Sequence, residues 1–220
     1  MRITSIETQK RNPKRKNLFA DGQFILGISD ETLIRFGIRT GDEIGPEKLK
    51  ALQQTEDLLG AKRAALRFLA TRPRTEREVR DKLREKEFSD EEISAAIKDL
   101  KQTGLLNDAD FARMFVHDAI ARRPTGKLLL KQKMTLLGLD KATIEESLQN
   151  SGEENDQQSL ALEAARKFIK KGQPPRGKRE MLKARNRVAN FLGRRGFTWD
   201  VIHPVLKSVF QDQGKEENEE

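Results

Sequence analysis

The sequence has no cysteine among its 220 residues. Disulfides and thiol nucleophiles are therefore excluded, and a reducing cytoplasm is the expected compartment. Long apolar runs are missing too, since no stretch approaches the roughly 18 apolar residues of a transmembrane helix. The start, MRITSIETQKRNPKRK, lacks the apolar segment of a signal peptide. We expect a protein that neither spans a membrane nor is secreted by a signal peptide.

Apolar residues are scarce overall. They make up 35% of the chain, charged residues make up another 35%, and the mean hydropathy is -0.74. A chain of this composition buries only thin cores. One small domain followed by an array of small helical units is therefore favoured over one large globule.

Charge is unevenly distributed along the chain. The net charge is +8 in total, with +5 over residues 1–20, +4 over 61–150, +10 over 157–210 and -4 over the tail, 211–220. Residues 121–135 contain five basic residues and no acidic one. A basic body with a short acidic tail indicates a polyanionic partner or an acidic protein surface.

The first 28 residues predict strands. Residues 3–10 alternate in polarity, Asn12-Pro13 marks a turn, and Asp21-Gly22 lies between two apolar segments, where it predicts a type I′ hairpin. A hairpin alone is only marginally stable. We therefore expect it to pack on a short helix that Ser29 caps and Gly37 ends.

Helix signals dominate from residue 47 onward, and one pattern occurs three times. The stretches LREKEFSDEEI (83–93), MTLLGLDKATI (134–144) and LGRRGFTWDVI (192–202) each place an apolar residue ten positions before an isoleucine. Another large apolar residue lies midway, and a polar residue follows it. We interpret each stretch as the turn between the second and third helices of a three-helix unit, with the polar residue capping the third helix. Capping boxes at Thr75/Glu78 and Ser89/Glu92 and a stop at Gly104 support the first unit.

The predicted fold is mainly α, an elongated array of three tandem three-helix repeats preceded by a small β-hairpin and helix domain. We place the N-terminal domain at residues 1–50 and the repeats at 51–106, 107–152 and 153–210, followed by an acidic, disordered tail over 211–220.

Basic residues recur on or beside the second helix of each repeat. Side chains three or four residues apart share a helix face, so stacked repeats would form a basic stripe that binds phosphates without regard to sequence and with strong salt dependence. In the first repeat, where Glu85 and Glu87 intervene, an ordinary solvated face is the alternative. The candidate binding residues are Lys82, Arg84, Lys86, Arg122, Arg123, Lys127, Lys131, Lys133, Arg176, Lys178, Arg179, Arg185, Arg187, Arg194 and Arg195.

No catalytic, metal or cofactor site is predicted. The segment GQPPRGKR (172–179) imitates a nucleotide-binding loop, but it has Arg where Ser or Thr is needed and follows a predicted helix instead of a strand. His117 and His203 lie in different repeats without further ligands at metal spacing, so we expect surface or partly buried helical histidines. Trp199 is expected in a core.

The segments RPRTEREVRDKL (72–83), GLLNDADFARMFV (104–116) and FLGRRGFTWDVI (191–202) resemble the RecX family, bacterial regulators of the RecA recombinase. The resemblance covers about residues 1–210, and RRPTGKLLL (122–130) and GQPPRGKREM (172–181) depart from the family pattern. It implies a curved chain of three-helix units that lies in the groove of the RecA–DNA filament. The resemblance further implies that, from this position, such a protein restrains filament growth, ATP hydrolysis, strand exchange and co-protease function.

The expected partners are thus the RecA filament and, more weakly, single- and double-stranded DNA, contacted by a monomer in the cytoplasm. Two alternatives stay open. One is a plain DNA-binding module whose helix pairs act as helix-turn-helix readers. The other is an enzyme that uses residues 172–179.

Overall fold

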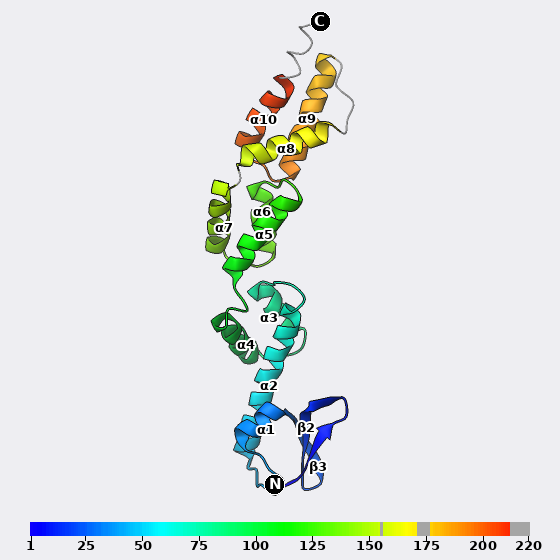
Figure 1. Cartoon of the computed structure of the whole chain (residues 1–220), viewed down its shortest axis with the longest axis vertical. Coiled ribbons are helices and arrows are strands. Elements are labelled where there is room, and N and C mark those ends of the chain that lie inside the picture. Colours follow the sequence, from blue (N-terminus) through cyan, green and yellow to red (C-terminus); the bar gives the residue numbers. More distant parts are fainter. Residues whose placement is uncertain (155, 171–176, 212–220) are drawn as a thin grey trace. The chain divides into compact units, whose positions relative to one another are not determined.

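The computed structural model describes residues 1–154, 156–170 and 177–211. Over these residues the chain forms three β-strands followed by ten α-helices (Figure 1). The fold is mainly α with a small antiparallel sheet at its start, which confirms the predicted fold class. The chain divides into two units, one of residues 1–73 and 79–106 and the other of residues 74–78 and 107–220. All but the first residue of the predicted acidic tail, 211–220, lies outside the described residues.

The sheet consists of β1 (Ile3–Gln9), β2 (Asn12–Ala20) and β3 (Gln23–Ser29), antiparallel and in that order. The predicted type I′ hairpin is confirmed, because Asp21 and Gly22 have φ angles of 48° and 81°. The first turn lies at Lys10 and Arg11, so its prediction at Asn12-Pro13 was wrong. Pro13 falls in an irregularity between the pairs Thr8↔Lys16 and Gln9↔Asn12, where its missing N–H removes no ladder hydrogen bond.

The sheet packs on α1 (Asp30–Phe36) and α2 (Pro46–Leu69). As predicted, the Ser29 hydroxyl accepts a hydrogen bond from the Thr32 N–H, and Gly37 ends α1 with a φ of 60°. Helix α2 is 24 residues long and contributes to two cores. Its first half contributes Leu52 to the core of the sheet, and its second half contributes Ala61, Ala64 and Ala65 to the core of the first repeat. The predicted division between residues 50 and 51 therefore falls inside one continuous helix.

The first repeat is completed by α3 (Glu76–Arg84) and α4 (Asp90–Gln102). Both predicted capping boxes are present: the Thr75 N–H donates to Glu78 Oε2 at 3.1 Å, and the Ser89 N–H donates to Glu92 Oε2 at 2.9 Å. Each hydroxyl in turn accepts the N–H of its glutamate. Gly104 follows α4 with a φ of 69°, as a helix stop requires.

The second repeat is formed by α5 (Asp108–Arg122), α6 (Lys127–Leu136) and α7 (Lys141–Glu154), and the third by α8 (Gln157–Ile169), α9 (Lys178–Arg194) and α10 (Trp199–Gln211). Each of the three repeats has its own apolar core. The first apolar residue and the isoleucine of the repeated pattern are buried in all three repeats: Leu83 and Ile93, Met134 and Ile144, Leu192 and Ile202. The residue midway is buried in the second and third repeats and half-buried in the first, where it is Phe88. This confirms that the pattern marks the turn between a second and a third helix.

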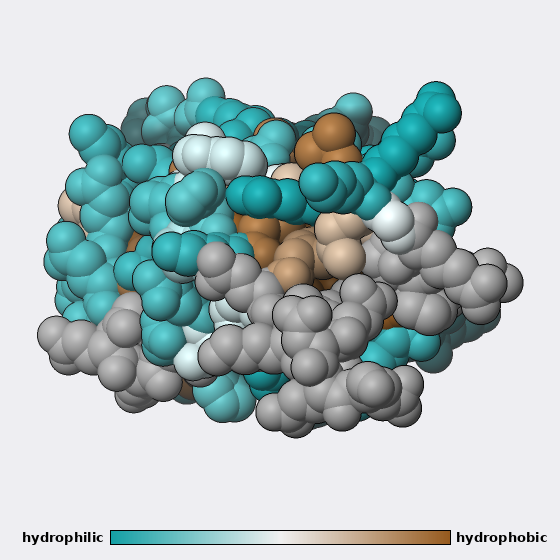
Figure 2. All heavy atoms as spheres, turned by 90° about the horizontal axis from the view of Figure 1, so that it is seen from above, coloured by the Kyte–Doolittle hydropathy of each residue, from teal (hydrophilic) through white to brown (hydrophobic). Residues whose placement is uncertain are grey.

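The described surface is mostly hydrophilic when the molecule is seen from above, with some apolar residues between hydrophilic ones (Figure 2). Among the described helices, none combines the length and the apolar character needed to cross a membrane.

Candidate polyanion-binding surface

The tight turns of the second and third repeats are built around glycines with positive φ, Gly138 at 84° and Gly196 at 82°. In the second unit, the N–H of Gly126, just before α6, donates to the carbonyl of Arg195 at 2.8 Å. A Cβ on Gly196 would lie 2.3 Å from the backbone nitrogen of Leu129. The start of α6 therefore lies directly on the turn between α9 and α10, which joins the second repeat to the third.

The same arrangement occurs once more within this unit. The Thr75 hydroxyl donates to the carbonyl of Leu137 at 2.8 Å, and a Cβ on Gly138 would lie 2.1 Å from Cδ of Arg77. In the first repeat the corresponding turn position is Glu87, which has a φ of 62° and is exposed. Glycine is thus used where another segment of the chain approaches closely, and a side chain is tolerated where the position faces solvent.

The predicted basic residues of the first repeat are largely neutralised by acidic neighbours. Lys82 Nζ lies 2.5 Å from Glu85 Oε2, and Arg84 lies 3.2 Å from Asp90 Oδ1. Lys86 is exposed, and among the described residues no acidic side chain pairs with it. These pairs favour the solvated-face interpretation for Lys82 and Arg84.

The basic residues of the second repeat differ in whether an acidic side chain pairs with them. Lys131 lies 3.7 Å from Glu145, whereas no described acidic side chain pairs with Lys133, Arg122 or Arg123, all of which are exposed. Lys127 is half-buried, and its N–H donates to Gln157 Oε1 at 3.1 Å. Among the described residues, the cations of the second repeat without an acidic partner are therefore Arg122, Arg123, Lys127 and Lys133.

The third repeat carries the least neutralised group. Lys178, Arg179, Arg185, Arg187 and Arg194 lie on α9 and are exposed, without ion pairs to other described residues. Arg187 and Arg194 are seven residues apart and so share a face of the helix. Arg176 lies outside the described residues.

Arg195 differs from its neighbours because it has structural partners. Its Nη1 donates to the carbonyl of Pro124 at 3.1 Å, and its guanidinium carbon lies 4.9 Å from the ring centroid of Phe191. These contacts hold the α5–α6 loop on the third repeat. Arg195 thus positions the basic loop as well as contributing charge.

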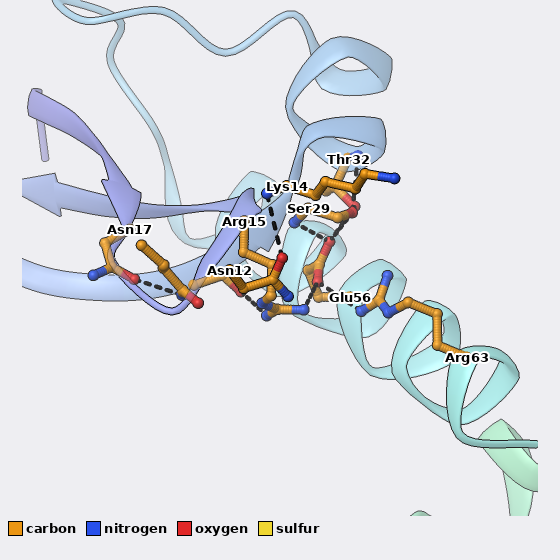
Figure 3. A network of polar contacts seen from close by, with 10 residues as sticks. Asn12, Lys14, Arg15, Asn17, Ser29, Thr32, Glu56 and Arg63 are labelled. Carbon is orange, nitrogen blue, oxygen red and sulfur yellow. Dashed lines mark hydrogen bonds and ion pairs between the residues drawn. The ribbon is translucent and has the colours of Figure 1, made fainter. Parts of the chain in front are cut away.

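A buried ionic network in the first unit was missed by the sequence analysis (Figure 3). Glu56 on α2 is only 5% exposed. Its carboxylate accepts hydrogen bonds from the N–H and hydroxyl of Ser29 and from the Thr32 hydroxyl, and Arg15 and Arg63 lie 3.2 and 3.4 Å from it. Burial alone would raise the pKa of Glu56, but the donors from Ser29 and Thr32 together with the charge of Arg15 lower it below the ordinary value. The network ties α1 and the sheet to α2.

Other predictions on chemistry had mixed outcomes. Trp199 was expected in a core, which is wrong: it is 63% exposed as the first residue of α10, where its ring lies 6.2 Å from that of His203. His117 and His203 are exposed helical residues, as expected. The described residues contain no group of three or more histidine, aspartate or glutamate side chains suited to a metal ion.

The segment that imitates a nucleotide-binding loop follows a helix, since α8 extends to Ile169. Its residues 172–176 lie outside the described residues. A phosphate-binding loop of this type requires a preceding strand, so the local fold does not favour one.

The protein is thus a basic tandem-repeat protein, in which a small sheet domain precedes three three-helix repeats. Among the described residues, the cations without an acidic partner are concentrated on α9, the second helix of the last repeat. Family models for the RecX N-terminal domain and the first, second and third RecX three-helix domains match residues 1–45, 61–100, 107–148 and 155–206. The chain belongs to the RecX family of regulatory proteins.

Individual relatives agree with this assignment. The chain is 33% identical to regulatory protein RecX of Clostridium beijerinckii over 211 residues, which covers 94% of this chain and 95% of the relative. It is 32% identical to regulatory protein RecX of Bacillus velezensis, covering 94% and 77%. A crystal structure of a regulatory protein RecX has the same fold, with a TM-score of 0.72 at 24% identity over 96% of this chain and 98% of the other. RecX from Lactobacillus salivarius gives a TM-score of 0.60 at 24% identity over 70% and 97%.

Proposed function

We propose that this protein is a non-enzymatic cytoplasmic regulator that binds the RecA–DNA filament and mainly inhibits its ATPase, strand-exchange and co-protease activities. The observation that supports this most is family membership over nearly the whole chain, including all three repeats. Relatives are named as regulatory proteins, and a regulator of a filament needs repeated contacts instead of a catalytic site.

The repeats suit a partner made of identical subunits. Within the second unit, consecutive repeats are joined through the Gly126–Arg195 hydrogen bond, so the cations of the α5–α6 loop and of α9 belong to one compact unit. Contacts that are individually weak then add, because the first one raises the effective concentration of the next. Phosphates and acidic side chains along a filament are the complementary groups.

The direct test adds the full-length protein to RecA on single-stranded DNA at far less than one molecule per RecA and follows ATP hydrolysis. A regulator that restrains a filament lowers the rate at such ratios, because one bound molecule affects many protomers. An unchanged rate at every ratio would refute the filament role.

A charge reversal on α6 tests the contact surface. The pair Lys131→Glu and Lys133→Glu should weaken binding to the filament without unfolding the chain, since both side chains are exposed. Of the two single variants, Lys133→Glu should weaken binding more than Lys131→Glu, because Lys131 is already paired with Glu145. The control is Lys50→Glu with Lys98→Glu, two exposed positions of the first unit with no assigned role. Equal losses in the variant and the control would remove α6 from the surface.

The alternative is a DNA-binding protein without a filament role, either independent of sequence or of helix-turn-helix type. The exposed cations of α9 are suited to phosphate contacts, which carry no sequence information. Competition between unrelated duplexes separates the two, because a specific reader discriminates about 10³-fold or more.

A further inference from the structure

A basic pocket of about 420 Å³ lies within the second unit, where the second repeat meets the third. The end of α5 and the loop after it contribute Arg122, Arg123 and Pro124. The remaining walls come from α8 and α9, through Ala164, Lys167, Phe168, Phe191 and Arg195. The pocket thus combines four cationic side chains with two phenylalanine rings.

The cations of the pocket are only partly neutralised. Lys167 pairs with Glu163, the residue one turn earlier on α8, at 2.5 Å, and both side chains are largely exposed. Arg122 and Arg123 form no ion pair with other described residues. An anion entering the pocket therefore meets two unengaged guanidinium groups, which are suited to bidentate contact with phosphate.

The rings give the pocket a second chemical property. Phe168 and Phe191 stack with centroids 4.3 Å apart and an angle of 18° between planes. The Arg195 guanidinium lies over the Phe191 ring, so Phe168 is the ring left to receive another planar group. Cations beside an aromatic surface are the combination that holds single-stranded nucleic acid, in which unpaired bases are free to stack.

We propose that this pocket binds single-stranded nucleic acid, with a phosphate on Arg122 and Arg123 and a base on the ring of Phe168. The arrangement favours a single strand over an acidic polypeptide, which has no planar bases to stack. It also favours a single strand over a duplex, whose bases are already stacked on each other. The proposal deepens the DNA contact of the proposed function, on which it rests, and names its site.

The test measures fluorescence anisotropy of a labelled oligothymidylate with the full-length protein and no RecA, at salt concentrations from about 50 to 200 mM. Arg122→Gln with Arg123→Gln should lower the slope of log K against log salt by about 1.4, which corresponds to two contacts to single-strand phosphates. The matched control, Lys50→Gln with Lys98→Gln, removes the same charge from the first unit and should leave the slope nearly unchanged. Equal slopes in the two double variants would overturn the phosphate site.

The base contact is tested separately. Phe168→Leu should weaken binding at least about fivefold at every salt concentration with the slope retained, because stacking is not electrostatic. An abasic oligomer of the same length should bind wild-type protein as weakly as thymidylate binds this variant. Phe168→Trp in a Trp199→Phe background keeps an aromatic ring at this position and should restore affinity. The fluorescence of the new indole should be quenched when the oligomer binds. This variant keeps the test decisive if Phe168→Leu disturbs the core.

Equal affinity for the abasic and thymidylate oligomers would overturn the base contact, and so would an indole signal in the Phe168→Trp variant that the oligomer leaves unaffected. Displacement of the oligomer by polyglutamate at equal charge would overturn the assignment to nucleic acid. The wild-type ATPase assay with RecA is independent of these results, so loss of this site and loss of the regulatory role are distinguishable.

Discussion

The joint between the second and third repeats is open to a quantitative test with three glycine-to-alanine variants. Gly126 has an ordinary φ of -79°, but a Cβ there would lie 2.2 Å from the backbone carbonyl of Gly196. Gly104 has a φ of 69° with nothing within 4 Å of a Cβ. Gly196 has both the positive φ and the close approach. The three variants therefore measure contact alone, backbone conformation alone, and both.

The expected costs follow from these geometries. Gly104→Ala places a Cβ in a left-handed conformation and should cost about 1 kcal/mol. Gly126→Ala cannot be relieved by a side-chain rotation, because the obstacle is backbone. The joint must open, which breaks the hydrogen bonds from Gly126 N–H to Arg195 O at 2.8 Å and from Leu128 N–H to Gly196 O at 3.1 Å. At about 1 kcal/mol each, plus the desolvation of the groups left unpaired, this costs about 3 kcal/mol. Gly196→Ala should cost about 4 kcal/mol, the sum of both effects.

Urea unfolding followed by circular dichroism gives the free energy of unfolding of each variant. Hydrogen exchange of peptides over residues 122–130 and 192–198 shows whether the loss of stability lies at the joint. The exchange data are needed because repeat proteins do not always unfold in a single cooperative step. Exchange should rise at the joint in Gly126→Ala and Gly196→Ala and remain at wild-type levels in Gly104→Ala. A Gly126→Ala protein with wild-type stability and exchange would refute the close approach.

Three further predictions follow from the charges and backbone. Glu56→Gln should cost about 2 kcal/mol in urea unfolding, since the charged acceptor of a buried network is lost. Because the folded pKa of Glu56 is lowered, its contribution is present above the unfolded pKa and is lost as pH falls through the folded pKa. The difference in free energy of unfolding between the wild-type protein and the variant should therefore shrink in acid. A difference that stays constant with pH would contradict the network. Glu87→Gly should raise stability by about 0.5 kcal/mol, because glycine adopts the φ of 62° without strain; thermal unfolding that shows a loss would contradict this. Arg187→Glu with Arg194→Glu should reduce oligonucleotide affinity and its salt slope, and an unaltered slope in anisotropy titrations would remove α9 from the surface.

The repeat was predictable because its signal is local and recurs. When two helices joined by a short turn pack together, the apolar residues at the start, middle and end of the pattern face the space between them. Leu83, Met134 and Leu192 are all buried for this reason. The Asp21-Gly22 turn was equally local, since positive φ at both positions suits few other residue pairs.

Other features depend on contacts between residues far apart in the sequence, which no local pattern announces. Glu56 looked like one of many carboxylates on a helix, and only the fold brings Arg15 and Ser29 to it. The pocket of the second unit was missed for the same reason, because Lys167 and Phe168 come from a first helix, whereas the predicted basic residues lie on second helices and beside them. The prediction for Trp199 was wrong because the first residue of a helix can face solvent even when it is aromatic, and Trp199 is the first residue of α10.

The aligned positions of the repeats nevertheless predict which basic residues are paired better than a count of cations does. The tight turn brings the residue after the first buried apolar position close to the first residue of the third helix. In the first repeat these positions are Arg84 and Asp90, which form an ion pair at 3.2 Å. In the third repeat they are Gly193 and Trp199, so the turn supplies no acid to the cations of α9. The residue types at these two positions thus decide whether the turn itself pairs a basic residue. Acidic residues elsewhere in a repeat act in addition, since Lys82 pairs with Glu85 and Lys131 pairs with Glu145. A polyanion therefore finds unpaired charge where neither the turn nor the adjoining helices supply an acid.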